Sequence, residues 1–282
     1  MSKAWPIVVA AAAMVVARPV LAQDWKTIHM ARQFAGEDVL RVNVEYGAGE
    51  LTIGPGTEGM LFRGMLRYDG SVFRPLNEYD NGQLRIGIQG GSIKGRNMKA
   101  GKLDLSLSPS VPLDLSLKFG AAQADLELGG LRIRRASVQT GASETNVRVS
   151  KPNRENCSSA SFEVGAAAFR ASGLGNLNCE DFRIAGGVGD VVLDFSGEFR
   201  NDINADIDMG LGSLTLRVPH GLGVSVRKSG ILASFDSQGL VKRGNVYYSE
   251  NFEKAEHKLT VQIDAALGAI KVQWVDGSLG SR

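Results

Sequence analysis

The chain has 282 residues, of which 43% are hydrophobic, 35 are glycine and 8 are proline, a composition that favours one large all-β domain. Its formal net charge is +2 at pH 7 and no basic stripe runs along it, which excludes an electrostatic nucleic-acid surface. The densest basic spot, Arg132, Arg134 and Arg135, is interpreted as a solvated strand face.

The N-terminus has the pattern of a secretory signal peptide. Lys3 supplies a positive charge, residues 7–17 are apolar, and Val20-Leu21-Ala22 forms a small-residue cleavage box before Gln23. The apolar run is too short to span a bilayer comfortably. We therefore expect residues 1–22 to be removed and the chain to be exported to the periplasm, the cell envelope or beyond, with no transmembrane segment left after cleavage.

Residues 23–100 form a leading section with an irregular pattern. Strand-like runs occur at 39–44, 51–53, 60–68 and 83–88, separated by turn signals. Because the open end of a stacked array exposes unpaired backbone, we expect this section to cap the array that follows. Its aromatic residues are expected to be half-buried capping residues: Phe62, Tyr68, Phe73 and Tyr79.

A glycine then returns at intervals of about 22 residues, each time four positions ahead of an alternating apolar run. After Gly187, for example, Val191, Leu193 and Phe195 alternate with polar residues, as along a strand with one buried face. Further copies follow Gly47 and Ala266. The structural repeat glycines are Gly47, Gly120, Gly141, Gly165, Gly187 and Gly210.

Each repeat is a strand, a glycine bend and a second strand. One repeat cannot bury its apolar face alone, whereas stacked repeats bury a continuous core. The pattern therefore predicts an all-β, β-solenoid-like fold with about 22 residues per rung. An antiparallel β-sandwich, whose strands also recur at short regular spacing, is the alternative.

The expected organisation after the leading section is a glycine-punctuated β-repeat domain over residues 101–276. The regular array is expected to run to about residue 230, and the period is lost between 231 and 258, where Tyr247, Tyr248 and Phe252 suggest a loop or hairpin excursion. Residues 259–275 are expected to return as a closing pair of strands. Residues 277–282 are interpreted as a disordered tail.

The only two cysteines occupy the same phase of consecutive repeats. Cys157 lies eight residues before Gly165, and Cys179 lies eight before Gly187. Equivalent positions in stacked rungs are about 4.8 Å apart, within the Cα separation that a disulfide tolerates. An exported chain reaches an oxidising compartment, so we predict a structural Cys157–Cys179 disulfide. A pair of buried free thiols is the alternative.

No motif for catalysis, cofactor binding or metal binding emerges from the sequence. There is no nucleophile elbow, zinc-protease motif or P-loop, and the histidines His29, His220 and His257 are scattered. The segment 202–208 resembles a calcium loop superficially, but Ile207 stands where the loop needs glycine and Ser213 where it needs glutamate. It is interpreted as an acidic outer strand face.

Paired carboxylates would be the signature of a carbohydrate-active β-helix enzyme. The candidates are Asp190, Asp194, Asp202, Asp206 and Asp208, and their spacing does not show whether two of them face one cleft. They alternate with apolar residues, as outward-facing strand residues do. We therefore expect no enzyme activity.

The repeats also carry a family resemblance. The segment 103–121 (LDLSLSPSVPLDLSLKFGA) and the glycine-bent rungs after it resemble the C-terminal domain of LiaF-type, cell-wall-active-antibiotics-response proteins and the related toastrack domains. Residues 40–70 resemble the region that precedes this domain in secreted relatives. The resemblance implies a β-solenoid-like envelope domain without known catalysis, acting in protein interaction or envelope-stress sensing.

One departure limits this resemblance, because LiaF-type sensors carry transmembrane helices ahead of the domain and this chain shows none after the signal. The expected function is a non-enzymatic exported module that binds an envelope protein or a cell-wall component. The alternative is an adhesin-like surface scaffold in which the solenoid is a rigid spacer.

Overall fold

The structure is a computed structural model that describes residues 24–90, 101–230 and 232–276. The expected signal peptide at 1–22 and the expected tail at 277–282 lie outside the described residues. Within these ranges the chain is nearly all β-strand, and the one helical element is the 3-10 turn η1 (Leu174–Leu177).

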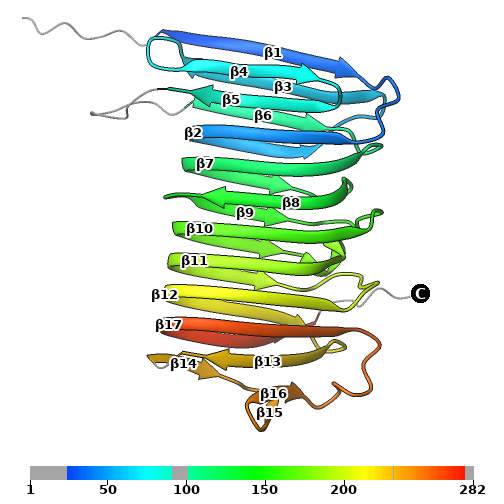
Figure 1. Cartoon of the computed structure of the whole chain (residues 1–282), viewed down its shortest axis with the longest axis vertical. Coiled ribbons are helices and arrows are strands. Elements are labelled where there is room, and N and C mark those ends of the chain that lie inside the picture. Colours follow the sequence, from blue (N-terminus) through cyan, green and yellow to red (C-terminus); the bar gives the residue numbers. More distant parts are fainter. Residues whose placement is uncertain (1–23, 91–100, 231, 277–282) are drawn as a thin grey trace, which may run out of the picture.

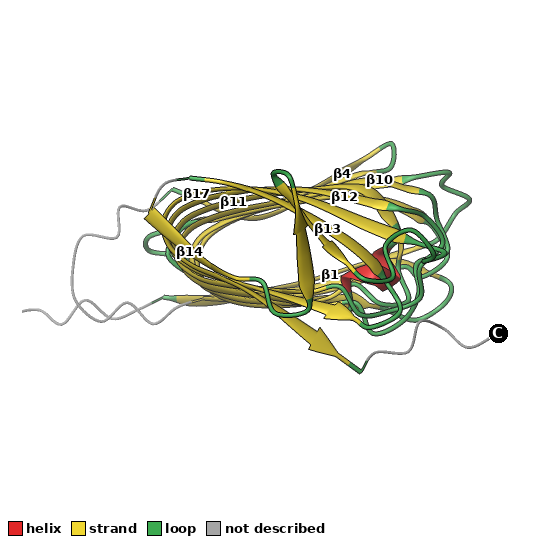
Figure 2. Cartoon of the chain, turned by 90° about the horizontal axis from the view of Figure 1, so that it is seen from below, coloured by secondary structure: helices red, strands yellow, loops and turns green. Residues whose placement is uncertain are grey.

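The repeating unit is a long strand that bends at its middle. These bent strands are β2 (Leu40–Pro55), β7 (Pro112–Glu127), β10 (Cys157–Ser172), β11 (Cys179–Asp194), β12 (Ile203–Pro219) and β17 (Lys258–Val275). A seventh rung is interrupted at the bend, giving β8 (Arg132–Thr140) and β9 (Glu144–Arg148). Seen end-on, the rungs enclose a flattened oval with the bends along one edge and the connecting loops along the other (Figure 2).

The two halves of each rung belong to two facing β-sheets. We call the sheet of the first halves sheet A and the sheet of the second halves sheet B. In sheet A the strands pair in the order β4, β5, β2, β7, β8, β10, β11, β12, β17, β13, β16, β15. In sheet B the order is β1, β3, β6, β2, β7, β9, β10, β11, β12, β17, β14.

The remaining strands build the two ends of the stack. At one end lie β1 (Trp25–Gln33), β3 (Met60–Asp69), β4 (Arg74–Asp80), β5 (Gln83–Gln89) and β6 (Gly101–Leu107). At the other end lie β13 (Gly223–Ser229), β14 (Leu232–Asp236), β15 (Leu240–Arg243) and β16 (Val246–Ser249). The rungs between the ends pair in parallel, which confirms the predicted solenoid and excludes the antiparallel sandwich.

The order of rungs in the stack differs from their order in the chain at both ends (Figure 1). The bent strand β2 lies between β7 and the rung formed by β5 and β6. Likewise β17 lies between β12 and the rung formed by β13 and β14. The expectation that 259–275 closes the array is therefore wrong. Any rung of matching shape can pair in parallel with β12, so a later strand occupies the place that the sequence order gave to β13.

The core is continuous because inward-facing side chains stack in register from rung to rung. Val138, Phe162, Ile184, Ile207 and Ile263 follow one another through sheet A, and each is buried. Contacts across the oval join the sheets, with the Phe162 and Phe169 rings 5.2 Å apart and the Phe182 and Phe195 rings 5.7 Å apart. Burial of this apolar surface is the main favourable term in the stability of the fold.

Both ends of the stack are covered by aromatic side chains. At the β1 end, Phe62 is buried and its ring lies 5.7 Å from that of Tyr79. At the other end the β15–β16 hairpin crosses the mouth of the oval, and Tyr247 packs edge-on against Phe235 at 4.9 Å. The segment 231–258 was expected to leave the array. The structure differs, because β14 pairs with β17 and forms the second half of the last rung.

Candidate interaction surface

The six predicted repeat glycines line up along the bend edge of the solenoid. A Cβ atom on Gly120 would lie 2.5 Å from the carbonyl oxygen of Gly47, and one on Gly165 would lie 2.8 Å from that of Gly141. Gly141, Gly187 and Gly210 meet the preceding glycine in the same way, at 2.5–3.0 Å. At these five bends the backbones of successive rungs approach too closely for a side chain, whereas a Cβ atom on Gly47 would meet nothing within 4 Å.

A second row of glycines lies two residues further on, and it has a different physical basis. Gly212 has a φ of +141°, a conformation that L side chains rarely adopt, and a Cβ atom there would overlap the carbonyl oxygen of Gly189. Gly268 stands in the same relation to Gly212, with a φ of +139°. The first row marks close stacking, whereas this second row fixes the bend itself.

Cys157 and Cys179 form a disulfide between β10 and β11, as predicted. They are direct partners in the parallel register, with Cα atoms 4.2 Å apart, and both side chains are buried. The described residues contain no free cysteine. The bond joins two rungs that already stack, so its role is structural.

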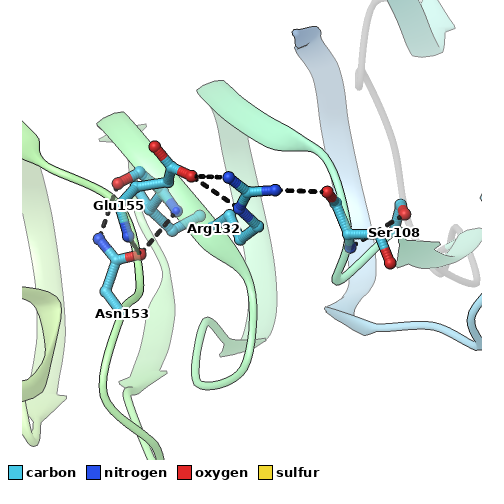
Figure 3. Close-up of polar contacts among 6 residues, drawn as sticks. Ser108, Arg132, Asn153 and Glu155 are labelled. Carbon is cyan, nitrogen blue, oxygen red and sulfur yellow. Dashed lines mark hydrogen bonds and ion pairs between the residues drawn. The ribbon is translucent and has the colours of Figure 1, made fainter. Parts of the chain in front are cut away.

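Asparagines hold the loop edge, opposite the bends, and Figure 3 shows one of them, Asn153. Asn153 is 1% exposed and bonds only to backbone: its Oδ1 accepts from the amides of Ile133 and Glu155, and its Nδ2 donates to the carbonyls of Ile133 and Leu177 at 2.7–3.1 Å. Asn176 likewise donates to the carbonyl of Val149 and accepts from the amide of Glu198, and Asn178 accepts from the amide of Arg200. The sequence does contain one sign of this role, because asparagine occurs in two equivalent loops, at positions 153 and 178.

We expect Asn153→Ala to lower the free energy of unfolding by about 2 kcal/mol, because buried backbone donors and acceptors lose their partners. Urea unfolding followed by circular dichroism measures the change. Asn146→Ala is the matched control, since Asn146 makes a single exposed bond of 3.3 Å to Asp125 and its loss should cost under about 0.5 kcal/mol. Equal effects at the two positions would contradict a structural role for Asn153.

The three arginines of the basic spot at 132–135 form ion pairs with two neighbouring acids, Glu155 and Asp114. Arg132 donates to Glu155 through Nε at 2.6 Å and to the Ser110 carbonyl at 2.7 Å (Figure 3). Arg135 lies 3.1 Å from Asp114, and this contact raises the pKa of the guanidinium. These pairs join adjacent loops and rungs, and the two carboxylates offset part of the charge of the three arginines.

The candidate carboxylates do not converge on one cleft. Asp190 and Asp194 follow the bend and lie on sheet B, whereas Asp206 and Asp208 lie on sheet A and point outward. Asp202 accepts a hydrogen bond from the amide of Lys258 at 2.9 Å. Within the described ranges no group of three or more His, Cys, Asp or Glu side chains is placed to hold a metal ion.

The bend edge carries a row of exposed aliphatic side chains, which we call the apolar ridge: Val188, Leu211, Leu267 and Leu232. They are direct neighbours on β11, β12, β17 and β14, and they are 53%, 44%, 45% and 67% exposed, respectively. Toward the β1 end the equivalent positions hold smaller side chains: Ala166 is the neighbour of Val188 on β10, and Ala121 and Ala48 are neighbours on β7 and β2. Apart from Leu232, each of these residues directly follows a repeat glycine or, for Leu267, the equivalent Ala266.

A shallow hollow of ≈580 Å³ runs beside the apolar ridge on the sheet A side. Its floor is made of small residues and one methionine: Gly186, Gly187, Met209, Gly210, Ala265 and Ala266. Asp208 and Asp264 stand on its rim. A second, longer groove of ≈830 Å³ continues along the bends toward the β1 end, past Lys118, Gln139 and Glu163.

Tyr46 is buried under the bend of β2 next to this longer groove. Its hydroxyl has no hydrogen-bond partner among the described residues, and burial, with Glu50 and Asp104 nearby, raises its pKa. The phenol is therefore neutral at physiological pH and belongs to the core.

An all-β solenoid of parallel rungs, bent at stacked glycines and closed by aromatic caps, is the class of protein that this geometry defines. The chain belongs to the toast_rack family: the model of the N-terminal domain of toast_rack, DUF2154, matches residues 22–170. The model described as cell wall-active antibiotics response LiaF, C-terminal, matches residues 172–272. The resemblance seen in the sequence is confirmed.

Solved structures that match the chain come from several bacteria. A "putative cell adhesion protein" of Clostridium sporogenes is 19% identical, with a TM-score of 0.47, and the match covers 89% of this chain and 100% of that one. A "putative adhesin" of Bacteroides fragilis is 14% identical, with a TM-score of 0.43, covering 88% and 97%. No curated protein matches the chain. Among the described residues, no helix is long and apolar enough to cross a membrane.

Proposed function

We propose that the chain is a non-enzymatic interaction module of the bacterial cell envelope, exported through residues 1–22. The observation that carries the proposal is the apolar ridge, a line of large aliphatic side chains left in water on a scaffold that buries nearly all its others. Contiguous exposed apolar surface of this kind marks interaction sites.

Three further features support the proposal. The disulfide suits an oxidising compartment outside the cytoplasm. The family model over residues 172–272 is described by a response to cell-wall-active antibiotics, which is an envelope process. The candidate carboxylates are divided between the two sheets, with Asp190 and Asp194 on sheet B and Asp206 and Asp208 on sheet A, so they do not all line one cleft.

The proposal is tested by capturing envelope components on the full chain. The bacterium that encodes the chain would express it with a C-terminal affinity tag and be cross-linked with a short amine-reactive reagent. We expect one envelope protein or wall fragment to be retained above the level of a tagged, unrelated exported protein. Retention of nothing beyond that control would refute the interaction module.

A parallel assay tests the expected absence of catalysis. The purified chain is incubated with cell-wall polysaccharides, and new reducing ends are counted against a heat-denatured sample. Release above that blank, lost on Asp190→Asn or Asp208→Asn, would overturn the proposal in favour of a carbohydrate-active enzyme.

A further inference from the structure

The apolar ridge has the spacing of one face of an α-helix. Its side chains sit on adjacent rungs, about 4.8 Å apart, and a helix advances about 5.4 Å per turn. A helix lying along the solenoid axis therefore presents one apolar side chain to each rung over three or four rungs. The order β11, β12, β17 and β14 aligns Val188, Leu211, Leu267 and Leu232 for such a contact.

The hollow beside the apolar ridge supplies room for the side chains of that helix. Its lining of glycine, alanine and Met209 leaves open space beside the bends, into which aliphatic side chains of the helix can fit. The side chains of a partner can interdigitate with the half-exposed leucines of the ridge and lie over the small residues of the hollow. Such packing is how apolar helix faces bind to protein grooves.

The charges immediately beside the apolar ridge are acidic. Asp208 and Asp264 lie on its sheet A side, and Asp190 lies on its sheet B side. Asp190 accepts a hydrogen bond from Ser213 at 2.6 Å, and Asp264 accepts one from Ser229. None of the three carboxylates forms an ion pair with another described residue.

One base near the ridge, Lys228, offsets part of the charge of these three carboxylates. Lys228 lies near the end of β13 and donates to the backbone carbonyls of Gly230 and Ala233. At the next outward-facing position on sheet A, two residues further from the bend, basic and acidic side chains are mixed, and Arg183 lies beside Asp206. The acidic character is thus confined to the margins of the apolar ridge, where the flanks of a bound helix would lie.

This arrangement disfavours the other apolar occupants. Two copies placed ridge to ridge would bring carboxylates against carboxylates, and an anionic lipid surface would meet the same repulsion. A partner that brings lysine or arginine to both sides of an aliphatic stripe gains apolar burial and ion pairing at once.

We propose that the apolar ridge and its hollow are the docking site for a basic amphipathic helix of a partner protein. The inference rests on the proposed function and names the surface and the chemistry of the partner. Leu211 and Leu267 are the central apolar contacts, and Asp190, Asp208 and Asp264 pair with the basic flanks of the helix.

The probe is a synthetic helical peptide of about 18 leucine and lysine residues, with leucine at i, i+3, i+4 and i+7 positions. Its binding to the full mature chain is measured by fluorescence anisotropy at low and at physiological salt. We expect the affinity to fall as salt rises, because the flanking charges are exposed and become screened. The same peptide with glutamate in place of lysine should not bind measurably.

Variants locate the binding. Leu211→Ser with Leu267→Ser should weaken binding about tenfold or more, and the isosteric Asp208→Asn with Asp264→Asn should weaken it several-fold and flatten its salt dependence. Val241→Ser is the matched control, since Val241 is an exposed aliphatic residue, 47% accessible, in the β15–β16 hairpin. It should leave the affinity unchanged. Melting curves confirm that each variant is folded.

Several outcomes would overturn the inference. They are equal binding of the glutamate peptide, an unchanged affinity in the ridge variants, and self-association of the wild-type chain that Leu211→Ser abolishes in sedimentation. If the chain still captures its envelope partner with Leu211→Ser and Leu267→Ser, the proposed function stands and the docking site falls. If the wild-type chain captures nothing, the proposed function itself falls.

Discussion

Gly212→Ala is expected to lower the free energy of unfolding by about 3 kcal/mol. A methyl group at residue 212 would overlap the Gly189 carbonyl oxygen, and the φ of +141° is strained for any L side chain. The bend of β12 must then open or shift away from β11. Because rungs stack on their neighbours only, the damage should spread to β11 and β17 before it reaches β2.

Thermal unfolding measures the loss of stability, and hydrogen exchange followed by mass spectrometry measures where protection is lost. Gly47→Ala is the matched control: Gly47 has an ordinary φ, and a Cβ atom there meets nothing within 4 Å. This control should change stability by less than about 0.5 kcal/mol. A Gly212→Ala protein as stable as Gly47→Ala would refute the bend geometry of β12.

Loss of the Cys157–Cys179 bond should destabilise the chain by about 3 kcal/mol. The bond closes a loop with a sequence separation of 22 residues, and the chain-entropy model assigns that magnitude to loops of this length. Chemical denaturation with and without reductant measures the difference. Both cysteines are at most 2% exposed, so reduction of the folded chain should be slow.

The double variant Cys157→Ala with Cys179→Ala separates the bond from the reductant. It should have the lowered stability of the reduced chain, and adding reductant should change nothing further. Titration of thiols in the unfolded, unreduced chain is the direct check. Two free thiols there would show that the bond does not form.

Much of the fold could be predicted because each rung repeats the same local solution. Close stacking demands glycine at the bend, and burial on one face demands alternation, so both leave a periodic trace in the sequence. The same phase placed Cys157 over Cys179, since equivalent residues of neighbouring parallel rungs are direct partners.

The candidate interaction surface could be predicted only in part. Val188 and Leu211 stand between two glycines, an unusual place for an aliphatic residue, and this signal was available in the sequence. The sequence did not show that these two residues form one row with Leu267 and Leu232, because that row depends on which rungs are neighbours in the stack. Asn153 was missed for a related reason: a loop asparagine shows its importance only once the backbone groups around it are known.

The sequence by itself determined the bent rung, its period, its inward-facing residues and the disulfide, because these follow from contacts within a rung or between equivalent positions. Only the tertiary structure decided the order of the rungs. Parallel pairing is nearly indifferent to chain order, so β17 takes the place beside β12 and carries Leu267 to Leu211. The glycine bends are local and periodic, whereas the surface built on them exists only in the assembled stack.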